Sequence, residues 1–290
     1  MNIIRTYVRG MREASRRPAM IGLLWLANIV LAVPAGILFS GALAAAAGRS
    51  LSPLDQDAAI EFLTGSAGAI RGSLTAALFA LVLGAFIAIF MFGGILNTLV
   101  RSGDGERPGQ TFFLGGARYY GRFLRLTLYS VVLWVPALAV FIPLHFLASS
   151  AMKGSTNEQL GFALTILRVA LALFLAYFIK MIMDYARIRI VREDTNGVYD
   201  ALVWAVRFVF GRPGGTLLLY YLLGITGWVM LAAYLVLHRL FPGATTGAVV
   251  SGFLLTQVFI AGRGWLKIAY QAAQSDLCEA SAEKSMSPQP

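Results

Sequence analysis

The chain has 290 residues, of which 58% are hydrophobic and 13% charged, and its mean hydropathy is +0.71. Water-soluble domains carry roughly 25% charged residues, so this composition excludes a soluble globular protein and indicates a polytopic membrane protein. The net charge of +10 does not indicate nucleic-acid binding, because the basic residues are spread over many loops instead of one soluble face.

The first predicted elements are a surface helix and a membrane span. Residues 1–18 alternate arginines with apolar side chains, which predicts a short basic amphipathic helix on the membrane surface. The alternative is a disordered positive segment that only orients the first span. Met20–Ala47 is the first span, since its apolar run is too long for a cleaved signal peptide.

Ser73–Val100 is the second predicted span, after a polar outer segment at 48–72. The Gly-rich loop at 101–109 lacks the Gly-Lys-Ser/Thr of a phosphate-binding loop, so it is interpreted as a turn. At 111–125, aromatic residues alternate with arginines, which predicts a second surface segment among anionic headgroups. The third span follows at 126–148.

The fourth span, Leu164–Arg192, passes without Pro or Gly from an apolar run into a charged one. Lys180, Asp184 and Arg187 lie three and four residues apart, so they share one helix face and predict a structural charge cluster. Apolar neighbours favour partial burial of Asp184. A turn at 195–197 and a third aromatic and basic segment at 198–210 follow.

The fifth span is predicted at 216–237, and the sixth begins at 247–262. The predicted fold class is therefore an all-α polytopic membrane protein with six transmembrane helices, amphipathic cytoplasmic surface helices, a single domain at 1–277 and a mobile C-terminal tail at 278–290. The same order of surface segment, short break, span, loop and returning span recurs three times, which predicts three hairpin repeats at about 1–101, 102–192 and 193–277. The alternative is that membrane hairpins resemble one another by shared topology alone.

The distribution of basic residues predicts orientation. All but five of the 24 Lys and Arg residues fall on the side of the two termini. Because cytoplasmic loops carry the excess of Lys and Arg, both termini are predicted to be cytoplasmic.

A resemblance adds to this prediction. The charged end of the fourth span, Asp184–Asp194, followed by a turn and by Ala201–Phe210, resembles a broad group of uncharacterised bacterial six-span proteins. That group includes the membrane domain attached to some glycerophosphoryl diester phosphodiesterases. The catalytic phosphodiesterase domain has no counterpart in this sequence. The resemblance therefore implies a module of the bacterial inner membrane without hydrolase activity.

The candidate functional residues are few. One cysteine and two histidines exclude an internal disulfide and a metal site of usual composition, and no cofactor or enzyme activity is predicted. Small residues predict close helix contacts, and polar residues in the spans predict hydrogen bonds between helices. The small residues are Gly84, Gly93, Gly94, Gly224 and Gly227, and the polar residues are Asn28, Asn97, His145 and Gln257.

A third set of residues is predicted to bind lipid or a partner protein. These are the arginines Arg118, Arg122, Arg125, Arg189, Arg192 and Arg207.

Two functions are compatible with these features. The first is a non-enzymatic scaffold or accessory subunit that docks a membrane-protein partner or anionic lipid on its basic cytoplasmic face. The second is a protein that transports or binds a lipid or another apolar molecule in a cavity between its hairpins, with a basic rim that holds a phosphate. Membrane lipids with anionic headgroups are predicted partners in both.

Overall fold

The structure is a computed structural model of the chain that describes residues 3–47, 67–101, 107–152, 158–240 and 245–286. Every regular element within these ranges is an α-helix, which confirms the all-α prediction. The helices are α1 (Ile3–Ser15), α2 (Pro18–Ala47), α4 (Ala67–Arg101), α5 (Pro108–Met152), α6 (Glu158–Glu193), α7 (Val198–Gly211), α8 (Pro213–His238) and α9 (Thr246–Met286).

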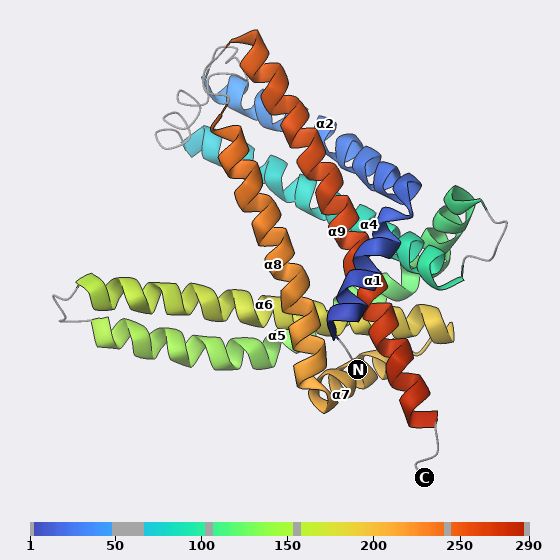
Figure 1. Cartoon of the computed structure of the whole chain (residues 1–290). Helices are drawn as coiled ribbons and strands as arrows, with labels where there is room; N and C mark the ends of the chain where they lie inside the picture. Colours follow the sequence, from blue (N-terminus) through green and yellow to red (C-terminus); the bar gives the residue numbers. More distant parts are fainter. Residues whose placement is uncertain (1–2, 48–66, 102–106, 153–157, 241–244, 287–290) are drawn as a thin grey trace.

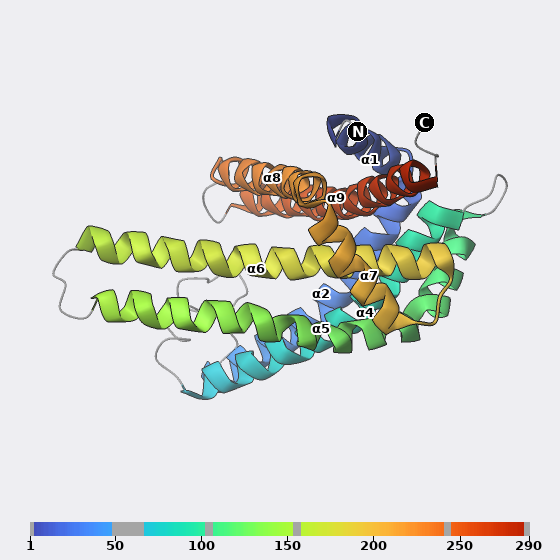
Figure 2. The ribbon, with the colours of Figure 1, turned by 90° about the horizontal axis from the view of Figure 1, so that it is seen from below.

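The long helices form three neighbouring pairs, α2 with α4, α5 with α6, and α8 with α9 (Figure 1). Both views show the pairs meeting at one end of the molecule, beside the short helices α1 and α7 (Figure 2). We call this end the base and define it as residues 3–24, 89–101, 107–126, 179–224 and 264–281. Of the buried hydrophobic residues in the described ranges, only Ala137 lies outside the base.

Beyond the base the helices expose apolar side chains. Val131 and Val135 of α5, Val229 of α8 and Phe253 of α9 are each more than 60% exposed. Large exposed apolar surfaces are unfavourable in water and typical of helices that contact lipid. Five helices are long and apolar enough to cross a bilayer, or six if the bent pair formed by Ile3–Ser15 and Pro18–Pro34 is one span. The chain is therefore a helical membrane protein.

Helix α5 corrects one part of the repeat prediction. The sequence predicted a break between the surface segment at 111–125 and the third span, but α5 is continuous over 45 residues. A helix of this length measures about 68 Å, more than twice the roughly 30 Å of a bilayer core. Its first turns therefore belong to the base. No proline interrupts the helix between Pro108 and Pro136, so nothing in this stretch ends it.

The amphipathic segment at the N-terminus is helical, as α1, which confirms the predicted helix and not its disordered alternative. A bend of 74° separates α1 from α2 at Arg16 and Arg17, immediately before Pro18. Proline disfavours helical backbone at the residue before it and is well suited to begin a helix. Gly10 lies against α9, where a Cβ atom would be 2.6 Å from Cβ of Ala273.

The C-terminal part of α9 corrects the predicted domain boundary. The tail predicted from residue 278 is helical as far as Met286, and Cys278 and Ser281 are each 6% exposed. The sequence prediction relied on the polar composition of this segment. Cys278 and Ser281 instead lie three residues apart on one face of α9, and this face is buried in the base.

Glycines allow α4 and α5 to approach closely. A Cβ atom on Gly93 would lie 3.0 Å from the carbonyl oxygen of Gly115, and one on Gly94 would lie 2.8 Å from the Phe112 ring. The predicted packing of these two glycines therefore agrees with the structure. The prediction for Gly84 was wrong, since a Cβ atom there would meet nothing within 4 Å.

Candidate functional site

A cavity of about 630 Å³ lies between α2, α4, α6, α8 and α9. Small-molecule sites commonly measure about 300 to 1,000 Å³. Helix α8 runs away from the base and α9 returns to it, so the cavity between them has one end near the base and one end far from it. The chemical character of the lining differs between these two ends. Near the base it is polar and charged, whereas the far end is apolar and aromatic. The polar group includes Lys180, Asp184, Lys267 and Gln271, and the apolar group includes Trp228, Leu231, Phe259 and Ile260.

The structure brings Lys180, Asp184 and Arg187 together at the polar end. Asp184 is only 4% exposed, and its Oδ1 accepts a hydrogen bond from Arg187 Nη1 at 2.8 Å. Nζ of Lys180 is 3.4 Å from the other carboxylate oxygen of Asp184 and donates to the Tyr220 hydroxyl at 3.0 Å. The single carboxylate of the cavity is therefore shared by two cations.

Aromatic rings form cation–π contacts with the cations at the same end. Nζ of Lys267 lies 4.2 Å from the centroid of the Phe92 ring, and Cζ of Arg187 lies 4.4 Å from the same centroid. Nζ of Lys180 lies 5.1 Å from the Tyr270 ring. Such contacts stabilise a cation by roughly 0.5 to 2 kcal/mol, but they do not neutralise its charge.

The cavity wall consequently carries surplus positive charge. Lys180, Arg263 and Lys267 line it, against the one carboxylate of Asp184. Arg263 and Lys267 are four residues apart on α9 and form no ion pair with any residue that the structure describes. This arrangement favours an anionic ligand.

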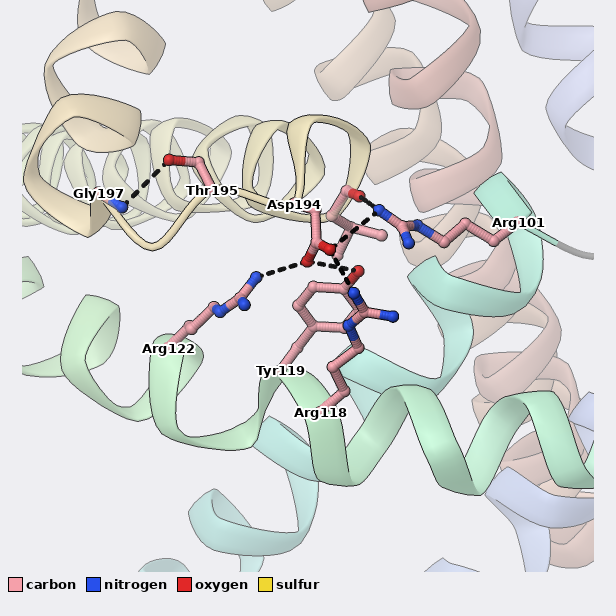
Figure 3. A network of polar contacts seen from close by, with 8 residues as sticks. Arg101, Arg118, Tyr119, Arg122, Asp194, Thr195 and Gly197 are labelled. Carbon is pink, nitrogen blue, oxygen red and sulfur yellow. Dashed lines mark hydrogen bonds and ion pairs between the residues drawn. The ribbon is translucent and has the colours of Figure 1, made fainter.

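A second polar cluster lies in the base around Asp194 (Figure 3). Arg122 donates to Oδ1 of Asp194 at 2.7 Å, Arg118 donates to Oδ2, and Arg101 lies 3.6 Å from Oδ2. The Tyr119 hydroxyl donates to Oδ1 at 3.3 Å. Since Arg101 belongs to α4 and the other three donors belong to α5, one carboxylate after α6 connects two helix pairs.

Local backbone geometry positions this carboxylate. Asp194 has a φ of 51°, in the left-handed region that aspartate tolerates better than most residues. That conformation ends α6. In the following turn the Gly197 amide donates to Oγ1 of Thr195 at 3.1 Å, which prepares the start of α7 (Figure 3).

Charge at Asp194 should make stability depend on pH. The hydrogen bond from Arg122 holds the pKa of the Asp194 carboxyl below its usual value, and the charges of Arg118 and Arg101 act in the same direction. Such a group stabilises the fold fully above its unfolded pKa of about 3.9 and loses this contribution as the pH falls through the lowered pKa. We expect Asp194→Asn to lower stability by about 2 kcal/mol at neutral pH.

Melting temperatures in detergent from neutral pH to about pH 3 test this expectation. The gap between the wild type and Asp194→Asn should narrow toward the acid end, as the pH approaches the lowered pKa of the Asp194 carboxyl. Asp200→Asn, which removes an exposed carboxylate on α7, is the control and should follow the wild type throughout. A gap of constant size over the whole range would mean that the carboxylate charge is not what the arginines recognise.

The remaining predicted arginines are scattered over the base. Arg189 donates to Glu193 at 2.8 Å and lies 5.1 Å from the Trp204 ring, and Arg192 is 3.9 Å from Glu279. Arg125 is exposed and donates only to the carbonyl of Gly121 among the described groups, while Arg207 is exposed on α7. The six arginines therefore do not form one site.

The polar residues predicted within the spans have separate roles. Asn28 lines the cavity and donates to the Leu24 carbonyl at 2.7 Å. Asn97 donates to the Thr111 carbonyl at 2.8 Å and connects α4 to α5, while Gln257 accepts from Trp25 at 3.0 Å and connects α9 to α2. His145 is exposed and packs against the rings of Phe141 and Phe146.

Sequence reasoning did not single out Asp194, Arg263 or Lys267. For Asp194 there was no signal, since its three arginines come from distant segments. For Arg263 and Lys267 the signal was present: two cations four residues apart continue an apolar helix with no acidic residue nearby. Among the described residues, no three His, Cys, Asp or Glu side chains are grouped as metal ligands would be.

Comparison of the chain with models of known protein families, with characterised proteins and with solved structures gave no match. The resemblance to the membrane domain of some glycerophosphoryl diester phosphodiesterases therefore stays a prediction.

Proposed function

We propose that the protein is an integral protein of the bacterial inner membrane, with six spans in three hairpins and with the base and both termini in the cytoplasm. The excess of Lys and Arg on the side of the termini supports this orientation. A reporter that is active only in the cytoplasm should be active when it is fused after Pro290. A periplasmic signal from that fusion would overturn the six-span arrangement.

We further propose that the protein binds an anionic lipid in the cavity between the hairpins. The observation that carries this proposal is the gradient in the cavity lining, from the charged residues Lys180, Arg263 and Lys267 near the base to the apolar residues Leu231 and Ile260 farther into the spans. An amphipathic molecule has the same gradient. Its headgroup would lie toward the base and its chains would point into the bilayer.

Energetics favour an anion at the charged end. Removing a cation from water is unfavourable by several kcal/mol unless an opposite charge or a set of hydrogen bonds compensates it. Asp184 forms ion pairs with Arg187 and Lys180, but no described carboxylate forms one with Lys267, which is only partly exposed; Arg263 is exposed, so this cost does not apply to it. A bound anionic headgroup would supply the missing charge.

The lining supports binding better than catalysis. It contains one carboxylate and no Ser, Thr, Cys or His side chain, so the lining has no Ser–His or Cys–His pair of the kind that hydrolases use. The scaffold that the sequence favoured remains a second candidate. Arg125 and Arg207, exposed on the base, support it, because they are free to face headgroups or a partner.

Lipid binding can be tested by filling the cavity. Leu231→Trp places a larger side chain at the apolar end, whereas Val229→Trp, on the same helix and 62% exposed, adds an indole ring outside the cavity. We expect phosphatidylglycerol, but not phosphatidylcholine with the same chains, to raise the melting temperature of the wild type and of Val229→Trp. Leu231→Trp should lose this response.

Native mass spectrometry of the same three proteins should show phosphatidylglycerol retained by the wild type and by Val229→Trp, and released by Leu231→Trp. If phosphatidylcholine stabilised the wild type equally, or if Leu231→Trp bound as well as Val229→Trp, the cavity would not be a site for anionic lipid.

A further inference from the structure

The charges at the polar end of the cavity also indicate which class of anionic headgroup fits best. This inference rests on the proposed lipid binding. Lys180, Arg263 and Lys267 line the cavity and Arg187 pairs with its one carboxylate, Asp184, so four cations stand against a single negative charge and a surplus of three positive charges remains. The carboxylate, Asp184, has its shortest contact with Arg187 at 2.8 Å, so it offers Arg263 and Lys267 little compensation.

A single negative charge would leave part of this surplus uncompensated. A phosphate monoester carries between about 1.5 and 2 negative charges at neutral pH and presents three terminal oxygens. A phosphate diester, such as the headgroup linkage of phosphatidylglycerol, carries one charge. The number of cations therefore matches the monoester better than the diester.

The three cations also approach from two sides. Arg263 and Lys267 are on one face of α9, since residues four apart are neighbours on a helix surface. Lys180 is on α6, and its ammonium lies beside the ring of Tyr270 from α9. A guanidinium binds two phosphate oxygens in its plane, and each ammonium binds as a compact charge, so the set suits a group with three equivalent oxygens.

We propose that the ligand is a lipid phosphomonoester whose phosphate is held by Arg263 and Lys267 of α9 and Lys180 of α6. The apolar chains then lie along Leu231, Phe259 and Ile260 toward the bilayer.

The experiment compares phosphatidic acid with phosphatidylmethanol and phosphatidylcholine of identical chains. Phosphatidylmethanol differs from phosphatidic acid by one methyl group on the phosphate, which removes the second charge. Affinities are measured for the purified full chain in detergent by native mass spectrometry and by concentration-dependent melting. Phosphatidic acid should bind at least about tenfold more tightly than phosphatidylmethanol, and phosphatidylcholine should bind weakest.

Lys267→Gln tests the assigned residues, and Arg207→Gln, an exposed cation on α7, is its matched control. Because Lys267 has no ion pair with any described residue, its loss should leave folding intact; if it does not, Arg263→Gln replaces it in the comparison. The preference for phosphatidic acid over phosphatidylmethanol should fall to near unity in Lys267→Gln and stay unchanged in Arg207→Gln.

The outcomes separate the two proposals. Equal binding of phosphatidic acid and phosphatidylmethanol, both tighter than phosphatidylcholine, would overturn the phosphomonoester and leave anionic lipid binding intact. Equal binding of all three lipids would overturn both. Stabilisation by glycerol 3-phosphate as strong as that by phosphatidic acid would overturn the lipid part and identify a soluble phosphate ester. An unchanged preference in Lys267→Gln would overturn the assigned site.

Discussion

Gly94→Leu is expected to unfold the base or to lower its melting temperature by far more than any surface change. A Cβ atom at Gly94 would lie 2.8 Å from both the ring and the carbonyl oxygen of Phe112, which is itself fully buried. Overpacking a close-packed core typically lowers stability by about 1 to 3 kcal/mol, and a contact with backbone cannot be relieved by turning a side chain. Gly94→Ala should therefore show a smaller effect of the same sign.

Gly84→Leu is the matched control on the same helix. It adds the same side chain where a Cβ atom meets nothing within 4 Å, so it should leave the melting temperature unchanged or raise it slightly. Leucine is a better helix former than glycine by up to about 1 kcal/mol. Size-exclusion profiles of detergent-purified variants after heating give the measurement. Equal profiles for Gly94→Leu and Gly84→Leu would show that the contact between α4 and α5 is not close-packed.

The two glycines also illustrate what the sequence could and could not predict. The helices themselves were predictable, because a bilayer leaves an apolar run of about 20 residues few alternatives to a helix. Which glycine faces another helix was not, because that depends on where two helices cross. Gly84 and Gly94 lie on the same helix, yet only Gly94 lies within the crossing of α4 and α5.

The base was less predictable than the spans for a related reason. Its polar contacts join residues far apart in the chain, as between Arg122 and Asp194. Sequence spacing identifies neighbours only within one helix, which is why Lys180, Asp184 and Arg187 were found and Asp194 was not. The change in composition near residue 125 predicts a break, but α5 is continuous because composition alone does not end a helix and no proline lies between Pro108 and Pro136.

Asp184→Asn is the second change that we expect to lower the stability of the fold strongly. The carboxylate is 4% exposed, and its removal leaves the largely buried guanidinium of Arg187 beside Phe92 without its ion pair. Breaking a buried ion pair in this way lowers stability by roughly 3 to 5 kcal/mol, because the remaining charge stays away from water. Asp200→Asn, at an exposed position, should change stability by less than about 0.5 kcal/mol.

A double-mutant cycle with Arg187→Gln isolates the ion pair, since the second change removes the stranded charge. The double variant should melt above Asp184→Asn alone, and unfolding in detergent followed by melting temperature gives the comparison. Because Asp184→Asn also increases the positive surplus of the cavity, phosphatidylglycerol should raise the melting temperature of this variant more than that of the wild type. If Asp184→Asn and Asp200→Asn had equally small effects, the cluster would be a solvated rim, and the charge of the cavity would not be set by Asp184.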